Sequence, residues 1–593
     1  MIQYTLSFAQ YHQHLIKVQL RFFAQAQQQI WLPTWIPGSY LIREFARHVE
    51  AVTVQASQSA DAINIQKVSK NQWQLSNQQP VEVEVGYLVY AYDLSVRGAY
   101  VDGERLYVNP AAVCMAVAGQ EENPIALNLI VPNQLSHFSF ASSLQSQLAE
   151  QTFGQINKQA SEMVQDQPSQ TQYQLGATDY YDLIDQPFEL AAQAMQSFRV
   201  KNIVHRVAIS GQHQTDLSRL SADLSRICAT QIELFGSAPF ADYVFMVMAT
   251  ANSYGGLEHQ RSTSLITPRD DLPKSSEPEK PSAGYQRFLG LCSHEYFHSW
   301  LVKFIRPHNY VRPNLHQEDY TSLLWVFEGI TSYYDDLMLY RSGVIDQLAY
   351  IDLVKDQLSR YLSNPGRQVQ SVAESSFDAW IKYYRPDENS NNAGTSYYNK
   401  GAVVALCLDL TLRQHGASLD QVLQQLYQRA QTGQQVNENS LPEVCEQLIQ
   451  HASPNSSLNS FFADYVYGTA ELPVTQLLAE FGIAVTLEQK AWPMGLKVQE
   501  SPQGLLVQQV LRDSVAAQAG ISAQDTIIAI DGLKASNSLL QQFASLAEAS
   551  SQMECHLFRR DELKRVTVQG HGFMLPSAKL AIEDKTRLTR WLN

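Results

Sequence analysis

The residues with the clearest chemical potential form the run Leu291-Cys-Ser-His-Glu-Tyr-Phe-His-Ser-Trp300. If this run is helical, His294 and His298 lie one turn apart on the same face, so both imidazoles can bind one metal ion. Glu295 lies beside them, where it can accept a proton from an attacking water. This His-Glu-x-x-His pattern predicts a site for one Zn²⁺ ion, with Glu295 as general base.

A catalytic zinc site needs a third protein ligand, because three protein donors leave the fourth position to water. Glu328 is a carboxylate set in the apolar run Trp325-Val-Phe-Glu-Gly-Ile330. Burying this charge is costly unless a cation is present. We therefore expect Glu328 as the third ligand, and Asp335, two helical turns later, as an acceptor for the N–H of a liganding histidine. The alternative is a solvent-facing pentad and a capping glutamate.

Two helical segments must position these ligands. Apolar residues from Phe288 to Trp300 recur with helical spacing, which predicts a helix over 285–305 that ends at Arg306, before Pro307. Glu328 lies in the second apolar helical run.

A further carboxylate follows the apolar run 242–249, which is short enough to be a buried strand. The chain then reads Gly255-Gly256-Leu-Glu258-His. Two glycines allow close backbone approach to a ligand, and Glu258 would lie about one strand's length from the zinc helix. The alternative is an ordinary Gly-Gly turn with a solvated glutamate.

Tyr398 opens an apolar helix, after a polar loop rich in turn-forming residues. A tyrosine at the start of a helix can present its O–H to a developing oxyanion. The chain contains 29 tyrosines, so spacing alone does not select Tyr398. Helical patterns over 401–480 suit a helical lobe on the catalytic domain.

Residues 1–172 alternate apolar and polar side chains in several stretches, which predicts an N-terminal antiparallel β domain. Its most unusual segment, 35–45, contains a Pro-Gly turn among aromatic and charged residues. This segment could pack onto the next domain or line a cleft, and packing is favoured. Gln-rich sequence over 145–172 marks the boundary with a catalytic domain over 173–480.

The last part of the chain changes character. Gly495 and Leu496 form a glycine turn into a strand, a second strand follows at 505–510, and the order of the later elements resembles a PDZ domain over 485–570. Residues 571–593 form a C-terminal tail. A PDZ domain takes an extended peptide onto a sheet edge and holds its terminal carboxylate with backbone N–H groups, here near Gly495 and Leu496. Peptide binding and a purely structural role are both compatible with this pattern.

Composition limits the protein class. At 593 residues the chain is too long for one core, and its 45% apolar and 17% charged content is that of a folded multidomain protein, here of α+β class. A net charge of −15 disfavours nucleic acid and anionic membranes as partners. No oligomeric state is indicated.

Localisation signals are absent from the sequence pattern. The N-terminus has neither a basic region nor a long apolar core, which argues against a signal peptide. No stretch reaches the roughly 20 apolar residues of a transmembrane segment. The six cysteines are scattered, without the paired spacing of a metal knuckle or a disulfide framework. A cytoplasmic location is the simplest interpretation, and a processed periplasmic protein would look the same.

Nearly the full chain resembles the glycyl aminopeptidase family, bacterial zinc metallopeptidases with a thermolysin-like (gluzincin) catalytic domain between an N-terminal β domain and a C-terminal PDZ domain. The resemblance rests on Trp35-Ile-Pro-Gly-Ser-Tyr40 with Arg43-Glu-Phe45, Gly255-Gly-Leu-Glu-His259, His294-Glu-Tyr-Phe-His-Ser-Trp300, Glu328-Gly329, Tyr398-Asn-Lys-Gly401 and the PDZ order.

The resemblance implies hydrolysis of the N-terminal peptide bond of peptide substrates, with small residues (glycine or alanine) preferred. It implies that Glu258 matches the glutamate that grips the free α-amine in related aminopeptidases, and that Tyr398 matches their oxyanion-stabilising tyrosine. The motif here reads Gly-Gly-Leu-Glu-His, whereas those relatives typically carry Gly-x-Met-Glu-Asn. Two alternatives remain: a zinc endopeptidase, if Glu258 does not face the cleft, and a non-catalytic PDZ scaffold with a vestigial zinc site.

Overall fold

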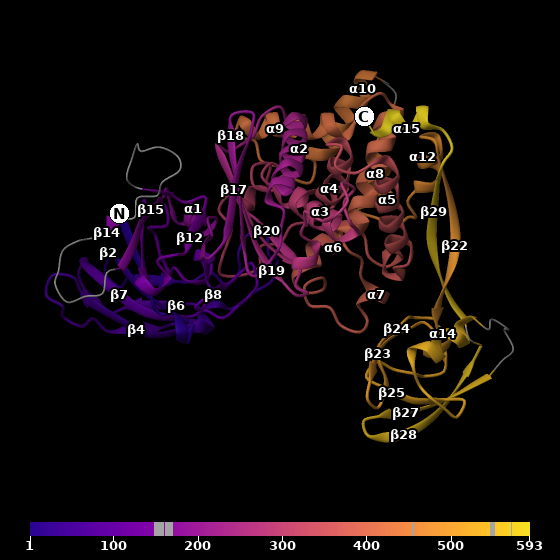
Figure 1. The fold of residues 1–593 in the computed structure, drawn as a ribbon, viewed down its shortest axis with the longest axis horizontal. Helices are drawn as coiled ribbons and strands as arrows, with labels where there is room; N and C mark the ends of the chain where they lie inside the picture. Colours follow the sequence, from indigo (N-terminus) through magenta and orange to yellow (C-terminus); the bar gives the residue numbers. More distant parts are fainter. Residues whose placement is uncertain (147–158, 161–169, 453–455, 546–551, 571, 593) are drawn as a thin grey trace. The chain divides into compact units, whose positions relative to one another are not determined.

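The protein is a multidomain α+β chain, seen here in a computed structural model (Figure 1). The structure describes residues 1–146, 159–160, 170–452, 456–545, 552–570 and 572–592. Most of the Gln-rich boundary expected over 145–172 lies outside these residues. Among the described helices, none has the length and apolar composition that crossing a bilayer requires.

The chain divides into two compact units, each described here by itself. The N-terminal unit comprises Met1–Asp319, Met338–Ile345 and Leu426–Val436. The C-terminal unit comprises Tyr320–Leu337, Asp346–Gln425 and Asn437–Asn593.

An eight-stranded sheet dominates the start of the N-terminal unit. Its strands, in order across the sheet, are β13 (Gln145–Ser146), β15 (Gln170–Ala177), β11 (Ile125–Pro132), β1 (Ile2–Gln10), β2 (Leu15–Ala24), β7 (Val81–Tyr90) and β4 (Val49–Ala56), with β14 (Gln159–Ala160) beside β15. Burial alternates along β1 and β2, as the period-two pattern predicts. β1 and β11 are parallel and the other pairs are antiparallel. The expected boundary at residue 172 falls inside β15, because this strand pairs with β11 as far as Ala177.

Two four-stranded sheets complete the β domain. One has the order β10 (Ala116–Val117), β3 (Gln29–Trp31), β6 (Gln72–Leu75), β5 (Ile65–Lys67), and the other the order β12 (Ser139–Ser142), β16 (Phe188–Ala191), β9 (Arg105–Val108), β8 (Ala99–Val101). After β3, the fully buried Trp35 donates from its indole N–H to the carbonyl oxygens of Asn314 and Gln317, at 2.8 Å each. The packing role favoured for this segment is therefore confirmed at Trp35.

A five-stranded sheet carries the first catalytic candidates. Its order is β17 (Ala194–Val200), β18 (Ile203–Ser210), β19 (Asp242–Thr250), β21 (Ser262–Pro268), β20 (Gly255–Glu258). β18, β19 and β21 run parallel, and β17 and β20 are antiparallel to their neighbours. α2 (Leu217–Phe235) joins β18 to β19, and β19 is the buried strand predicted over 242–249. α3 (Ala283–Phe297) packs against α2, β20 and β21, so β20 lies beside the helix that carries the pentad.

The chain after α3 is mainly helical. The longer helices are α4 (Ile330–Arg341), α5 (Gln347–Leu362), α6 (Val372–Phe377), α8 (Asn399–Gln414), α9 (Leu419–Gln431), α10 (Ser440–Ala452) and α12 (Val474–Glu480). A single turn of π-helix, η7 (Trp325–Gly329), precedes α4 and packs against α8. A Cβ on Gly329 would lie 2.6 Å from the Gly401 Cα, so glycine at this position lets η7 and α8 approach closely.

The PDZ domain stands between two paired strands. β22 (Ile483–Pro493) pairs antiparallel with β29 (Gly572–Ile582) along its whole length. Between them lie β23 (Leu496–Ser501), β24 (Gly504–Val510), α13 (Val515–Gln518), β25 (Thr526–Ile530), β26 (Leu533–Lys534), α14 (Asn537–Ser545), β27 (Gln552–Arg559) and β28 (Glu562–Gln569). α15 (Lys585–Leu592) follows β29, and its buried Trp591 donates from the indole N–H to the Tyr333 hydroxyl at 2.9 Å. The segment expected as a C-terminal tail is thus a strand and a helix.

Candidate active site

α3 presents the His-Glu-x-x-His pentad but is shorter than the sequence predicts. The helix ends at Phe297, and His298 is its C-terminal cap. The prediction that it continues to Arg306 is wrong, because the backbone turns back on itself after His298. In that turn the Ile305 N–H donates to the Trp300 carbonyl at 2.7 Å. The second histidine of the pentad is therefore at the helix end, where a tight turn begins.

The two histidine rings of the pentad lie together. The ring centroids of His294 and His298 are 4.7 Å apart, and the rings are nearly perpendicular. Nδ1 of His298 lies 3.0 Å from the carbonyl oxygen of Leu301. Because a carbonyl only accepts, Nδ1 carries the proton, and Nε2 then has the lone pair with which a histidine binds a metal. The Leu301 carbonyl thus accepts the N–H of His298, which is the role that the sequence assigned to Asp335. A bond from Asp335 to a liganding histidine stays a prediction.

Glu328 lies in the π-helical turn η7, and only 2% of its surface is exposed. The prediction of a buried carboxylate in this apolar run is confirmed. Isolated π-helical turns occur frequently at functional sites. The turn gives Glu328 a fixed position just before α4.

The expected metal ligands come from both units. His294 and His298 belong to the N-terminal unit and Glu328 to the C-terminal unit. Two imidazoles and one carboxylate form a donor set that catalytic zinc sites use, and burial of the carboxylate costs less when a cation shares its surroundings. These residues fit a divalent zinc ion.

A group of donor atoms within the N-terminal unit includes His298. One atom from each of Glu258, Glu295 and His298 lies within 4.8 Å of the other two, and all three side chains are buried. The alternative of a solvated glutamate at Glu258 is therefore wrong, since only 4% of this residue is exposed. The structure brings the expected general base and the expected amine-binding carboxylate to the same histidine.

Two glycines leave room for these carboxylates. A Cβ on Gly256 would lie 2.8 Å from Glu295 Cγ, so the close approach expected at the Gly-Gly pair is to this side chain. A Cβ on Gly38 would lie 2.6 Å from Glu258 Oε2, and Gly38 has a φ of +90°. Gly255 has open surroundings, with its nearest neighbour, Ile266, 4.0 Å from the same hypothetical atom.

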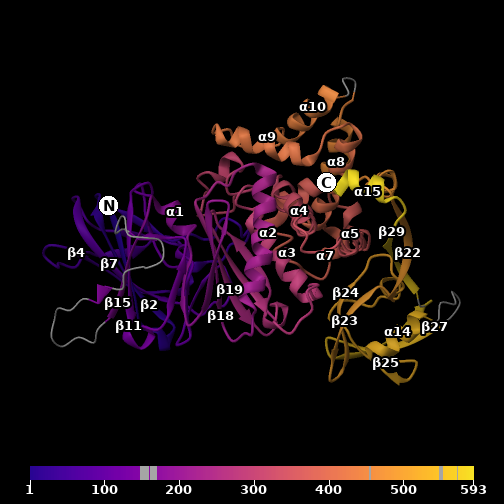
Figure 2. The same cartoon turned by 45° about the horizontal axis from the view of Figure 1, so that its top comes forward.

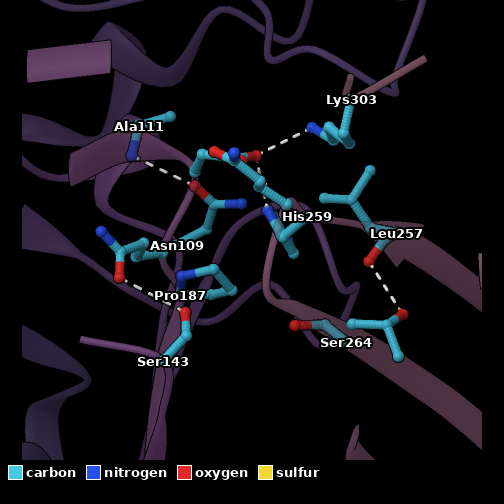
Figure 3. Close-up of polar contacts among 12 residues, drawn as sticks. Asn109, Ala111, Ser143, Pro187, Leu257, His259, Ser264 and Lys303 are labelled. Carbon is cyan, nitrogen blue, oxygen red and sulfur yellow. Dashed lines mark hydrogen bonds and ion pairs between the residues drawn. The ribbon is translucent and has the colours of Figure 1, made fainter. Parts of the chain in front are cut away.

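The residue after Glu258 belongs to an ionic cluster in which His259 and Lys303 are buried and Asp185 is partly buried. His259 Nδ1 lies 3.2 Å from Asp185 Oδ1, and Lys303 Nζ lies 2.8 Å from the same oxygen (Figure 3). Burial alone would raise the pKa of Asp185, but Lys303 and His259 outweigh it and hold this pKa well below its usual value. The cluster fixes the chain on both sides of the site, at the end of β20 and in the turn after α3.

Sequence reasoning missed Asp185 and Lys303. Their contact joins residues 118 positions apart, and neither lies in a local motif. In the structure, the backbone next to Lys303 is strained, because the φ of +99° at Val302 is rare for a β-branched residue.

A cavity of about 230 Å³ lies in the N-terminal unit beside Glu258. Its wall includes Ile36, Pro37, Gly38, Glu258, His259 and Lys303. Glu258 Oε1 is buried and has no hydrogen-bond partner within the described residues. The segment 35–45 therefore has both roles weighed from the sequence: Trp35 packs, and the next three residues line the cavity.

Tyr398 lies immediately before α8, among other tyrosines. Its hydroxyl is 3.3 Å from that of Tyr384, and its ring stacks on that of Tyr397 with centroids 4.7 Å apart. Burial, followed by the charge of Glu328, raises the pKa of Tyr398 well above its usual value. The hydroxyl therefore keeps its proton and can act as a hydrogen-bond donor. Tyr384 was not singled out from the sequence, because nothing in its spacing distinguishes it.

The expected carboxylate-binding turn of the PDZ domain is already bonded to its own chain. The Gly495 N–H donates to the Trp492 carbonyl at 3.1 Å. The Trp492 indole N–H donates to the Leu496 carbonyl at 2.8 Å. Among the described strands, β23 has β24 as its one partner, so its other edge is where an added peptide strand would pair. Trp492 thus occupies two backbone groups at the start of that edge.

Comparison with known proteins agrees with this arrangement. The family model of the peptidase M61 N-terminal domain matches residues 3–192, that of the M61 glycyl aminopeptidase matches 287–404, and that of the PDZ domain matches 484–557. No curated protein matches the chain by sequence.

Solved structures also resemble the chain. A crystal structure of an aminopeptidase N family protein from Idiomarina loihiensis is 36% identical to it, with a TM-score of 0.90 and 100% of both chains covered. An M1 zinc metallopeptidase from Deinococcus radiodurans is 11% identical, with a TM-score of 0.48, and the match covers 80% of this chain and 94% of that one. Family models over both the β domain and the pentad helix, together with a relative that matches over the full length, show that this chain belongs to the M61 glycyl aminopeptidase family and carries a PDZ domain.

Proposed function

We propose that this protein is a zinc aminopeptidase that removes small N-terminal residues, glycine or alanine, from peptides. His294, His298 and Glu328 would hold one Zn²⁺ ion. The observation that supports this most strongly is that the rings of His294 and His298 lie together, and that the buried donor atoms of Glu258 and Glu295 lie within 4.8 Å of one of His298. Zinc in such a site supplies Lewis acidity and lowers the pKa of water to about 7.

Glu295 is the proposed general base. Its carboxylate accepts a proton from the water that attacks the scissile carbonyl, and then returns this proton to the leaving amine. The backbone of Gly256 packs against the same side chain and limits where the carboxylate can lie. A carboxylate that is held in one position needs less rearrangement to reach the reactive geometry.

Tyr398 is the proposed oxyanion donor. Its raised pKa keeps the O–H protonated, so it can donate to the carbonyl oxygen as negative charge develops there. A donor of this kind is typically worth roughly 10²–10³ in rate.

Glu258 is the proposed binding group for the substrate's free amine. A buried carboxylate with an unbonded oxygen favours a cation that brings N–H donors, and the α-ammonium of a peptide is such a group. Holding the amine would fix the register, so that one residue is removed at a time. The preference for glycine or alanine rests on family membership alone.

The compartment is also a proposal. All six cysteines are buried and free of disulfide bonds, which supports a reducing cytoplasm.

The first test compares glycyl and alanyl amides with their N-acetylated twins, before and after removal of metal by a chelator and reloading with zinc. We expect activity to require zinc and a free amine. Equal hydrolysis of the acetylated twins would identify an endopeptidase. Absence of turnover by zinc-loaded protein on every substrate would favour the scaffold alternative.

The second test replaces the proposed base. Glu295→Gln should retain about one zinc per chain while turnover falls by at least roughly 10². Glu279→Gln, at an exposed glutamate of the same unit, is the matched control and should leave activity unchanged. Turnover of Glu295→Gln close to that of the wild type would overturn the base assignment.

A further inference from the structure

The segment 381–396, here called the tyrosine loop, contacts the proposed oxyanion donor. The Tyr384 hydroxyl lies 3.3 Å from that of Tyr398, and the Tyr383 ring centroid lies 5.6 Å from the ring of Tyr398. Two side chains of the loop therefore define the position of the Tyr398 ring and hydroxyl. Any displacement of the loop would therefore also displace the Tyr398 hydroxyl.

The tyrosine loop is not closely packed underneath. A cavity of about 350 Å³ lies between the loop and Asn364, Gln370 and Ser375. Beside this space the loop is held at separate points, and one of them is Gly394, whose backbone nitrogen would lie 2.7 Å from a Cβ on Gly366. The attachment next to Tyr398 is at Thr395, whose N–H donates to Gln370 Oε1 at 3.1 Å and whose carbonyl accepts from the Ser375 hydroxyl.

A further attachment of the loop is to the PDZ domain. α7 (Ser390–Ala393), within the loop, lies beside β23 and β24 in both views (Figures 1 and 2). The buried Asn392 donates from Nδ2 to the Val510 carbonyl at 2.9 Å and accepts from the Arg512 N–H, through Oδ1, at 2.8 Å. Its amide thus bonds the PDZ backbone as a neighbouring strand would. Asn391 adds a bond between side chains, to Gln509 at 2.8 Å.

The PDZ domain is itself held to the helices of the same unit. β29 packs against α5, where the Ser359 hydroxyl accepts from the Ala578 N–H at 3.1 Å. β22 pairs with β29 along its length, so both connections into the PDZ domain leave from this anchored pair of strands. Asn392 therefore ties the tyrosine loop to a domain with a second attachment.

We propose that Asn392 is a positioning residue through which the PDZ domain holds the tyrosine loop, and with it Tyr398, in the geometry that catalysis needs. The proposal rests on the oxyanion role of Tyr398 proposed above. It gives the PDZ domain a part in the reaction that requires no peptide bound to it. Asn392 touches no substrate in this scheme and acts only through the loop.

The experiment compares Asn392→Ala with Asn391→Ala in the full-length zinc-loaded protein, on a glycyl or alanyl amide. Asn392→Ala should lower kcat by about tenfold to a hundredfold with little change in KM, because a small displacement of a catalytic group has this effect. Asn391→Ala is the matched control and should lower kcat less than threefold, since it loses one contact between side chains. Equal kcat for Asn392→Ala and the wild type would overturn the proposal.

A double-mutant cycle with Tyr398→Phe separates positioning from a general loss of structure. If Asn392 acts through Tyr398, Asn392→Ala should lower kcat no further in the Tyr398→Phe background. Independent, multiplying losses would overturn the proposal. If Tyr398→Phe alone leaves kcat unchanged, the oxyanion assignment fails instead, which keeps the two failures distinct.

Hydrogen exchange gives a readout that does not depend on turnover. Amide exchange over 381–396 should become faster in Asn392→Ala than in Asn391→Ala, while exchange in α3 stays as in the wild type. Unchanged exchange over the loop, or equally faster exchange throughout the C-terminal unit, would count against a local positioning role.

Discussion

Gly256 lies so close to Glu295 that a Cβ added to the glycine would be 2.8 Å from Cγ of the glutamate. Gly256→Ala must therefore displace the proposed base or β20, although the backbone conformation itself accepts alanine. We expect kcat/KM to fall by about 10² with zinc content unchanged. Steady-state kinetics with metal analysis measures both.

Gly255→Ala is the control for this change, because the space beside Gly255 is open. It should keep kcat/KM within about threefold of the wild type. Comparable losses in both variants would show that the Gly-Gly strand tolerates no side chain at all, which would contradict the specific role of the contact with Glu295.

Gly38→Ala should weaken recognition of the amine. The added methyl group would overlap the Glu258 carboxylate, and the φ of +90° is unfavourable for alanine. We expect KM for a free-amine substrate to rise by about tenfold, and the difference in kcat/KM from its N-acetylated twin to shrink. Gly119→Ala is the control, since Gly119 also has a positive φ but has no neighbour within 4 Å of an added Cβ. A KM that changes equally in both variants would contradict this prediction.

Acid should destabilise the protein through Asp185. Its pKa is lower in the folded than in the unfolded chain, so below the usual value of 3.8 the unfolded chain binds more protons. This contribution to stability is complete above about pH 5 and is lost as pH falls through the usual value and below it. Asp185→Asn should be less stable than the wild type at pH 7 but lose less stability on acidification, as measured by thermal unfolding from pH 7 to pH 3. Asp352→Asn, at an exposed carboxylate, should keep the wild-type slope.

Trp492 should limit peptide binding by the PDZ domain. Its indole N–H donates to the Leu496 carbonyl, a backbone group near the turn where a peptide terminus would bind, and substitution of the side chain removes this bond. Trp492→Ala should raise the affinity for peptides with a free C-terminal carboxylate by at least tenfold, measured by fluorescence anisotropy. Trp492→Phe, which also lacks the indole donor but keeps a ring, should fall between the two. Equal binding by all three proteins would show that this edge is not the peptide site.

The local patterns predicted most of the framework. The strand predicted over 242–249 is present as β19, because a short apolar run is stable where neighbouring strands and helices bury it. The pentad and the carboxylate of Glu328 were found because their residue types are unusual in apolar helical runs. The excess length predicted for α3 came from apolar residues that continue past His298 in a tight turn, where periodicity carries no information.

The contacts that shape the site could not be predicted in the same way. Gly38 and Glu258 are 220 positions apart, and Asn392 meets Val510 across 118 positions. Such pairs depend on how whole domains pack, which no local spacing encodes. The composition of the Pro-Gly turn at Gly38 marked it as unusual, but the sequence did not identify Glu258 as its neighbour.

The pairing of β22 with β29 makes the PDZ domain a removable insertion. Pro493 and Gly572 face each other in register, so the chain leaves the helical part and returns to it at adjacent points. A short hairpin turn could join these two residues and bypass everything between them without moving β22, β29 or α15. The PDZ domain can therefore be removed or exchanged at one spot, at the cost of the bonds between Asn392 and its backbone.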